Sequence, residues 1–167
     1  MFHAYPEDAR QMILYLDNKP NISDFYYVRN VAGWDLERGR ISKEQVKKSL
    51  SSTPFSICAY DAGSVVGMVR MSGDKGMYGY IQDLIVVPAQ RNQKIATDLL
   101  LRLLGKVAGL EGYLIGACPS KIAVSLYLRF GFVPRGIGDN PFMYFQVKGD
   151  NLTLLLSRMV KGSCPGV

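Results

Sequence analysis

One short segment of this 167-residue chain has the composition and the position of a phosphate-binding turn. Arg91–Ala96 follows the apolar run Leu84–Val87, which Pro88 closes, and leads directly into the leucine-rich stretch Thr97–Leu104. A short hydrophobic run ended by proline predicts a buried strand, and the leucine-rich stretch predicts a helix. The first backbone N–H groups of a helix have no partner within it, and the helix dipole favours anions there. The segment therefore predicts a strand–turn–helix unit that receives phosphate.

A second segment, Ala123–Phe132, has a tyrosine near its middle and closes with glycine and phenylalanine. Together the two segments resemble the GNAT superfamily of N-acetyltransferases. The pattern of that family is Leu-x-Val-x-Pro-x-x-(Gln/Arg)-x-x-Gly-x-(Gly/Ala), followed by Asn-x-x-Ala-x-x-(Leu/Phe)-Tyr-x-x-x-Gly-Phe. Lys94 and Ser120 depart from it, because they stand where glycine and asparagine are usual. The positions that agree are Leu84, Val86, Pro88, Arg91, Ala96, Ala123, Leu126, Tyr127, Gly131 and Phe132.

The resemblance extends upstream through Ala32–Trp34, Val66–Arg70 and Tyr80–Asp83, and it spans roughly residues 10 to 148. It implies one acetyltransferase domain over residues 1–167, with residues 149–167 as an extension beyond the family core. It also implies an α/β (α+β) sandwich with a mixed, mostly antiparallel central sheet and helices on both faces. The implied reaction is direct transfer of an acetyl group from acetyl-CoA to a primary amine of a small molecule or peptide, without a metal.

Binding of acetyl-CoA is expected at three places. The family and the physics of helix N-termini both assign the phosphates to the backbone N–H groups of Arg91, Asn92, Gln93, Lys94, Ile95, Ala96 and Thr97. The strand residues Leu84, Ile85, Val86 and Val87 would orient the pantetheine and thioester, because family members splay this strand from the next and leave backbone groups for the cofactor. Ser120 either contacts the cofactor or only caps a helix.

Lys94 leaves three interpretations open. A lysine in a first helical turn opposes the helix dipole unless an anion neutralises it. Its ammonium could therefore point at a coenzyme A phosphate and strengthen binding. It could also project into solvent while its backbone N–H binds the phosphate, or it could weaken cofactor binding.

Two side chains are candidates for proton transfer. Tyr127 matches the family tyrosine that protonates the departing thiolate, and a phenol with a reference pKa of about 10 stays protonated at neutral pH. Its alternative role is a packed aromatic in the core. Asp83 lies inside an otherwise apolar strand, where burial favours uptake of a proton and would make it a usable base. It could instead be a structural acceptor that binds a loop N–H or pairs with Arg70.

The acceptor amine has less support in the sequence. Tyr27 and Trp34, on the first predicted helix and its exit, could line the acceptor pocket, but either could equally belong to the core. The identity of the amine therefore stays open.

Hydrophobic patterning predicts the elements that must position these residues. Ser42, followed by Gln45, is typical of a capping box, and Asp61–Ser64 is typical of a hairpin turn. Ile95, Leu99, Leu103 and Val107 repeat every four residues and predict an amphipathic helix. The expected strands are Met12–Leu16, Phe55–Tyr60, Val65–Met71, Tyr78–Val87, Tyr113–Cys118 and Phe142–Val147, and the expected helices run from Asn21 or Ser23 toward Gly33, from Ser42, from the segment after Arg91, over Pro119–Phe130 and over Asp150–Val160.

Composition restricts the other functions. His3 is the only histidine, which argues against a Ser-His-Asp hydrolase, a Cys-His protease and a histidine-rich metal site. The cysteines, Cys58, Cys118 and Cys164, are widely separated and fit neither a disulfide framework nor a zinc site. No apolar run is long enough for a membrane span, and the N-terminus does not have the pattern of a signal peptide. We therefore expect a cytoplasmic protein without a metal.

Charge bears on the partners. The net charge of +6 and the pI near 9.3 fit a generic basic protein, and they also fit attraction for anionic coenzyme A. Basic residues are scattered, with Lys47-Lys48 the only adjacent lysine pair, whereas a nucleic-acid surface would show more clustering. The alternatives to an amine acetyltransferase are a catalytically silent coenzyme A-binding module and an RNA-directed acetyltransferase. The predicted helix Asp150–Val160 would dock on its own domain or on a dimer partner, so both a monomer and a homodimer are open.

Overall fold

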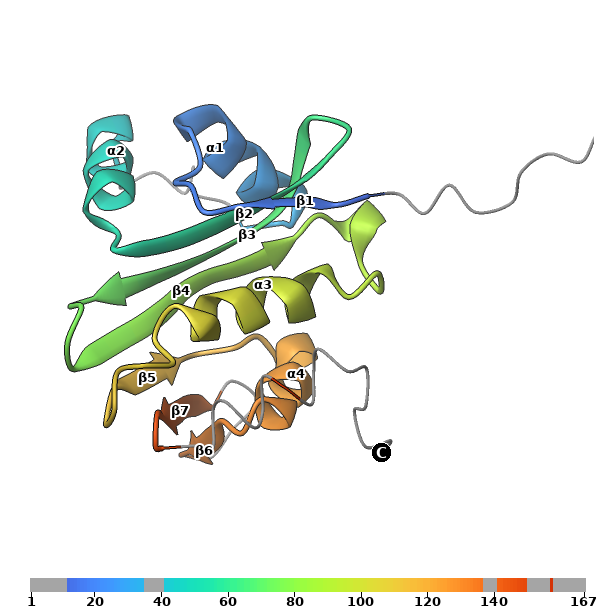
Figure 1. Cartoon of the computed structure of the whole chain (residues 1–167). Helices are drawn as coiled ribbons and strands as arrows, with labels where there is room; N and C mark the ends of the chain where they lie inside the picture. Colours follow the sequence, from blue (N-terminus) through green and yellow to red (C-terminus); the bar gives the residue numbers. More distant parts are fainter. Residues whose placement is uncertain (1–11, 35–40, 137–140, 150–156, 158–167) are drawn as a thin grey trace, which may run out of the picture.

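The protein is described here by a computed structural model that covers residues 12–34, 41–136, 141–149 and 157 (Figure 1). A sheet of seven strands runs through it in the order β1-β2-β3-β4-β5-β7-β6. In chain order the elements are β1 (Leu14–Leu16), α1 (Ile22–Val31), α2 (Lys43–Ser52), β2 (Phe55–Asp61), β3 (Ser64–Gly73), β4 (Tyr78–Val86), the 3-10 turn η1 (Pro88–Gln90), α3 (Ile95–Gly105), β5 (Leu114–Ala117), the 3-10 turn η2 (Lys121–Ala123), α4 (Val124–Arg129), β6 (Val133–Arg135) and β7 (Phe142–Gln146).

The pairing of the strands confirms the predicted fold class. Every neighbouring pair is antiparallel except β4 with β5, which run parallel. Figure 1 shows α1 and α2 on one side of the sheet and α3 on the other. The mixed sheet with helices on both faces is therefore the predicted α/β sandwich.

The first two helices begin where their capping residues predict. The Asn21 side chain accepts a hydrogen bond from the Asp24 N–H and caps α1. At α2 the Ser42 hydroxyl accepts from the Gln45 N–H, while the Gln45 side chain accepts from the Ser42 N–H. This reciprocal pair is the predicted capping box, and it satisfies two donors that a helix end would otherwise leave unpaired.

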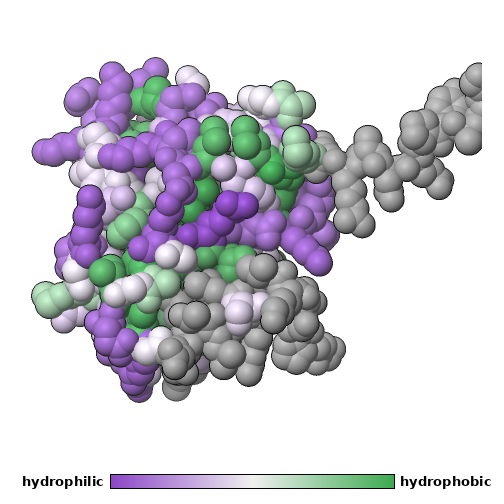
Figure 2. Space-filling model, in the orientation of Figure 1, coloured by the Kyte–Doolittle hydropathy of each residue, from purple (hydrophilic) through white to green (hydrophobic). Residues whose placement is uncertain are grey.

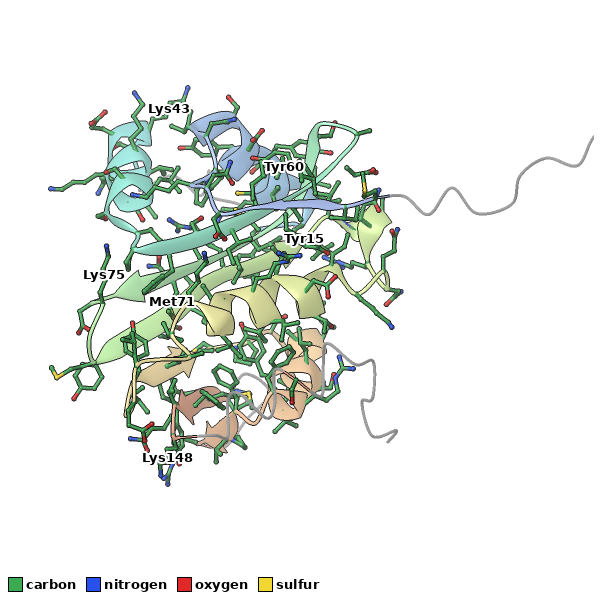
Figure 3. All side chains as sticks on the ribbon, viewed as in Figure 1. Tyr15, Lys43, Tyr60, Met71, Lys75 and Lys148 are labelled. Atoms are coloured by element: carbon green, nitrogen blue, oxygen red, sulfur yellow. The ribbon has the colours of Figure 1, made fainter. Side chains whose placement is uncertain are left out.

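The apolar face of α3 forms the centre of the core. Leu99, Leu100, Leu103 and Leu104 are fully buried between this helix and the sheet, as the four-residue repeat predicts. Met71 from β3 lies in the same core, and Figure 3 shows the side chains that fill the space around it. This packing fixes the start of α3 relative to the end of β4, which is where the predicted phosphate turn lies.

The strand β4 changes partners along its length. Tyr78–Ile81 pairs with Leu114–Ala117 of β5, but β5 then ends. A register shift against β3 leaves Gln82 outside the ladder, and Asp83–Val86 pairs with β3 alone among the described strands. The half of β4 that leads to the turn therefore lacks a partner on its β5 side, as the predicted splay requires.

Two elements differ from the predictions. The edge strand β6 was not predicted, because it has only three residues, all exposed, and contains Pro134. The helix predicted over Pro119–Phe130 starts as the 3-10 turn η2 and becomes α-helical only from Val124. The predicted helix Asp150–Val160 lies almost entirely outside the described residues.

Figure 2 shows polar and apolar residues interspersed over the visible face. No helix among the described residues is both long and apolar enough to cross a bilayer.

Candidate active site

A cavity of about 410 Å³ lies between the free half of β4, the start of α3 and the segment that contains α4. The end of α1 closes it. The residues that line it are Ala32, Trp34, Leu84, Ile85, Val86, Gln90, Arg91, Asn92, Lys94, Ile95, Ala96, Thr97, Ser120, Ile122, Ala123, Ser125, Leu126 and Arg129. A cavity of this size falls within the range of small-ligand sites.

The turn before α3 has the geometry of an anion site. Lys94 is the N-cap of α3 with φ 63° and ψ 3°, in the left-handed region, and Asn92 has φ 65°. No side chain caps this helix, so the first N–H groups of the helix remain available to a ligand. The family glycine at this position has a clear physical reason, because glycine takes a left-handed conformation without steric cost.

The charged side chains that line the cavity are all basic among the described residues. Arg91, Lys94 and Arg129 line it, and no described lining residue is acidic. The Arg91 side chain also donates from Nε to the Val86 carbonyl at 3.4 Å, which holds the turn against the end of β4. The cavity therefore attracts an anionic ligand such as a phosphate.

Tyr127 lies beside the cavity but is not one of its lining residues. Its neighbour Leu126 lines the cavity, while the Tyr127 ring is buried edge-on against Phe132 with ring centroids 5.0 Å apart. Burial raises the pKa of the Tyr127 phenol above its ordinary value, and the nearby Tyr80 adds to the rise. The hydroxyl is therefore protonated at neutral pH.

Asp83 is buried in a cluster of two guanidinium groups. Arg70 donates to Asp83 Oδ2 from Nε at 2.7 Å and from Nη2 at 2.6 Å, and Arg29 pairs with Oδ1. The remaining Arg70 nitrogen, Nη1, donates to the Thr53 hydroxyl at 3.1 Å. Both carboxylate oxygens thus have cationic partners, which favours the structural alternative for Asp83 over a base.

Of the remaining predicted site residues, some line the cavity and others do not. Trp34 lines the cavity, whereas Tyr27 is half exposed and does not. Ser120 also lines the cavity, and as the N-cap of η2 its side chain makes no capping hydrogen bond. Val87 and Gln93 are absent from the lining, and the Val87 N–H donates to the Val66 carbonyl at 2.9 Å.

Sequence reasoning did not identify seven lining residues as site residues: Ala32, Gln90, Ile122, Ala123, Ser125, Leu126 and Arg129. Ala32 comes from the end of α1, far from the turn in sequence. The last five lie on η2 and α4, around the family tyrosine. A projection of that helix from Ile122 onward could have found them, because the cavity takes the face opposite the one that buries Tyr127.

Solved structures share this fold. A Staphylococcus aureus protein (meticillin-resistant strain) described as "Probable Acetyltransferase" is 23% identical, with a TM-score of 0.67, over 76% of this chain and 98% of its own. A GNAT family N-acetyltransferase from Escherichia coli, solved in complex with CoA, is 20% identical, with a TM-score of 0.62, over 89% and 88%. The ribosomal-protein-S18-alanine N-acetyltransferase from Escherichia coli is 13% identical, with a TM-score of 0.64, over 83% and 96%. The fold is thus that of an acetyltransferase domain.

The sequence assigns the family. The model of the acetyltransferase (GNAT) family matches residues 19–132, which is more than half of the chain. The chain therefore belongs to the GNAT family of acyltransferases. A search of curated proteins finds no significant match. Within the described residues no group of histidine, cysteine, aspartate and glutamate side chains could hold a metal ion.

Proposed function

We propose that the protein transfers an acetyl group from acetyl-CoA to a primary amine of a small molecule or peptide by direct attack. The observation that carries this proposal is the cavity that joins the free half of β4 to the uncapped start of α3. One end offers helix N–H groups and basic side chains for phosphates. The other end offers an unpaired strand edge for an extended chain, which is the shape of pantetheine.

The pyrophosphate, the pantetheine and the thioester of acetyl-CoA would each be held by different residues. The N–H groups of Ile95, Ala96 and Thr97, with Arg91 and Lys94, would bind the pyrophosphate. The Leu84–Val86 edge would bind the pantetheine and bring the thioester to the end of the cavity at Leu84. When bound, acetyl-CoA supplies the activated acetyl group.

The reaction then needs three proton transfers: the ammonium loses one proton before the attack, the same nitrogen loses a second after it, and the departing sulfur gains one. The amine nitrogen attacks the thioester carbonyl carbon, and the carbon–sulfur bond breaks with the electron pair on sulfur. Tyr127 gives its proton to this thiolate and regains one from solvent. Since both oxygens of Asp83 are engaged by Arg29 and Arg70, we assign removal of both protons from the nitrogen to water.

A thiol-release assay tests the proposal. Purified protein is mixed with acetyl-CoA and, one at a time, a panel of small primary amines and short peptides, and free coenzyme A is measured. We expect thiol release that depends on one class of amine, with the acetylated amine identified by mass spectrometry. Tight acetyl-CoA binding without thiol release from any amine would contradict the proposal.

That contradicting outcome corresponds to a second candidate function, a catalytically silent coenzyme A-binding module. One observation favours it: the Tyr127 ring is buried and does not line the cavity. The RNA-directed alternative rests only on the basic charge, and salt-sensitive binding of transfer RNA would support it.

Lys94→Gly should separate backbone strain from charge at the turn. Glycine removes a left-handed lysine, a conformation that costs roughly 1–2 kcal/mol for a residue with a side chain, so the melting temperature should stay level or rise. Loss of the ammonium should weaken acetyl-CoA binding by about 1 kcal/mol, the size of a partly exposed charge pair. Calorimetric titration of acetyl-CoA at low and high salt should show this difference shrinking as salt screens the contact.

Two variants serve as controls for the Lys94 prediction. Lys94→Asn removes the charge but keeps a residue that tolerates the left-handed region, so it should lose affinity like Lys94→Gly. Ala62→Gly relieves a similar conformation, φ 45°, in the β2–β3 turn and should leave affinity unchanged. Equal affinity of wild type and Lys94→Gly at every salt concentration would make Lys94 a solvated side chain. Tighter binding by the glycine variant would make it an obstruction.

A further inference from the structure

A buried ion cluster contacts Trp34, one of the residues that line the cavity, through the side chain of Arg29. Its guanidinium pairs with Asp83 on one side and lies 5.3 Å from the ring centroid of Trp34 on the other. Trp34 lines the cavity, whereas Arg29 and Asp83 do not. The Arg29 guanidinium therefore contacts the cavity lining at the indole.

The end of α1 is built to bring Trp34 back onto Arg29. The Trp34 N–H donates to the Arg29 carbonyl at 2.8 Å, and the Gly33 N–H donates to the Asn30 carbonyl at 3.0 Å. These two bonds form a Schellman motif, in which the residue after the glycine contacts the last turn of the helix. Gly33 has the left-handed φ of 78° that this motif requires. The backbone thus places the indole over its own helix end, and the guanidinium is its contact.

Arg29 is in turn held from three directions. Asp83 Oδ1 accepts a hydrogen bond from Arg29 Nη1. The ring of Phe25, one helical turn earlier in α1, lies 5.3 Å from the Arg29 Cζ, and the Trp34 ring lies at the same distance. Arg70 lies 4.9 Å from the same Phe25 ring and holds the other oxygen of Asp83. A guanidinium that is ion-paired and lies against two aromatic rings has little rotational freedom, so it limits the movement of the rings in contact with it.

Trp34 stands at the acyl end of the cavity. Asp83, to which Arg29 is bound, directly precedes Leu84, the lining residue of β4 farthest from the phosphate turn. The strand rises about 3.3 Å per residue, so Val86 and the turn beyond it lie progressively farther away. A wall at this end contacts the acetyl group or the incoming amine rather than the phosphates.

We propose that Arg29, anchored by Asp83, is a positioning residue that holds the Trp34 indole as the wall against which the acceptor amine is aligned. This inference deepens the proposed acetyl transfer and rests on it for its kinetic readout. In this proposal Trp34 helps to determine which amine is accepted. Asp83 contributes by holding Arg29 in place and does not transfer a proton.

The environment of the indole can be measured directly by tryptophan fluorescence, because Trp34 is the only tryptophan in the sequence. Arg29→Met keeps much of the apolar contact and leaves Asp83 paired with Arg70, so the buried carboxylate is not orphaned. Acrylamide quenching of Trp34 fluorescence should increase about twofold or more in Arg29→Met. Arg102→Met is the matched control: Arg102 lies 4.4 Å from the Tyr15 ring and does not line the cavity, so quenching should match wild type.

The kinetic test is a double-mutant cycle with the best amine from the panel. Arg29→Met and Trp34→Ala should each raise the KM for the amine by roughly tenfold, with the Kd for acetyl-CoA within about twofold of wild type, since the phosphate turn is intact. If Arg29 acts through Trp34, the double variant should be no worse than Trp34→Ala alone. Additive effects, or an unchanged quenching constant in a folded Arg29→Met protein, would overturn the inference.

The two proposals fail in different ways. If no amine accepts the acetyl group, the proposed function fails, and the quenching experiment alone decides whether Arg29 holds the indole. If transfer occurs but the cycle is additive, the positioning role fails while the acetyltransferase stands.

Discussion

Replacing Tyr127 with phenylalanine should lower the rate of acetyl transfer by on the order of a hundredfold or more, the usual loss when a general acid is removed. The affinity for acetyl-CoA should hardly change, because Tyr127 does not line the cavity. Phenylalanine keeps the edge-on packing against Phe132, so the fold should survive. Turnover is measured by thiol release, and acetyl-CoA binding by calorimetric titration.

Tyr113→Phe is a suitable control for this prediction. Tyr113 is a buried phenol outside the cavity, and its hydroxyl donates to the carbonyls of Asp74 and Tyr78 at 2.7 and 2.9 Å. Its loss should lower stability without slowing transfer. Full activity of Tyr127→Phe would return Tyr127 to a packing role and leave Tyr80 as the next phenol to test. A hydrogen bond with Cys118 raises the pKa of Tyr80 to about 12, so it too is protonated at neutral pH.

The pH dependence of the acid follows from the direction of the pKa shift. A phenol with a raised pKa stays protonated through the neutral range and beyond its ordinary value of about 10. Ionisation of Tyr127 therefore cannot limit activity between neutral pH and about 10. A loss of rate in that range must come from another group.

Most of the fold could be predicted because its elements follow local rules. The capping box at Ser42, the β2–β3 hairpin and the repeat along α3 each depend on residues close together in the sequence. The strand β6 could not be predicted, because three exposed residues with a central proline have no hydrophobic period. The family resemblance implied a mixed sheet but did not name β4 and β5 as the parallel pair, which joins segments separated by α3.

In the candidate site, too, local features could be predicted and contacts between distant segments could not. The turn Arg91–Thr97 is local, and the uncapped helix start follows from its sequence. The left-handed backbone of Lys94 was not anticipated, because lysine rarely adopts it and only the family glycine hinted at it. The partners of Asp83 were only half anticipated: Arg70 lies on the neighbouring strand, but Arg29 is 54 positions away on a helix. Contacts of that separation depend on packing, which no local pattern encodes.

Asp83→Asn should destabilise the protein strongly and leave the acidic limb of the pH–rate profile where it is. Removal of the charge leaves the buried guanidinium of Arg70 and the partly buried guanidinium of Arg29 without a counterion, and breaking a buried pair in this way typically costs about 3–5 kcal/mol. For a chain of this length that corresponds to a fall in melting temperature on the order of 10 °C. The measurements are thermal unfolding and the pH dependence of kcat/KM at a temperature where the variant is folded.

The two roles of Asp83 make opposite predictions for this variant. If Asp83 is the base, Asp83→Asn should lose the acidic limb of the pH–rate profile while its melting temperature stays nearly unchanged. If Asp83 instead anchors Arg29 and Arg70, the variant should lose stability and retain the acidic limb. Asp17→Asn is the control, because it breaks an exposed ion pair with Lys106 and should cost less than about 1 kcal/mol. An asparagine variant that melts like wild type but loses its acidic limb would restore Asp83 as the base. The Arg29–Trp34 contact would then have to be held by packing against Phe25 alone.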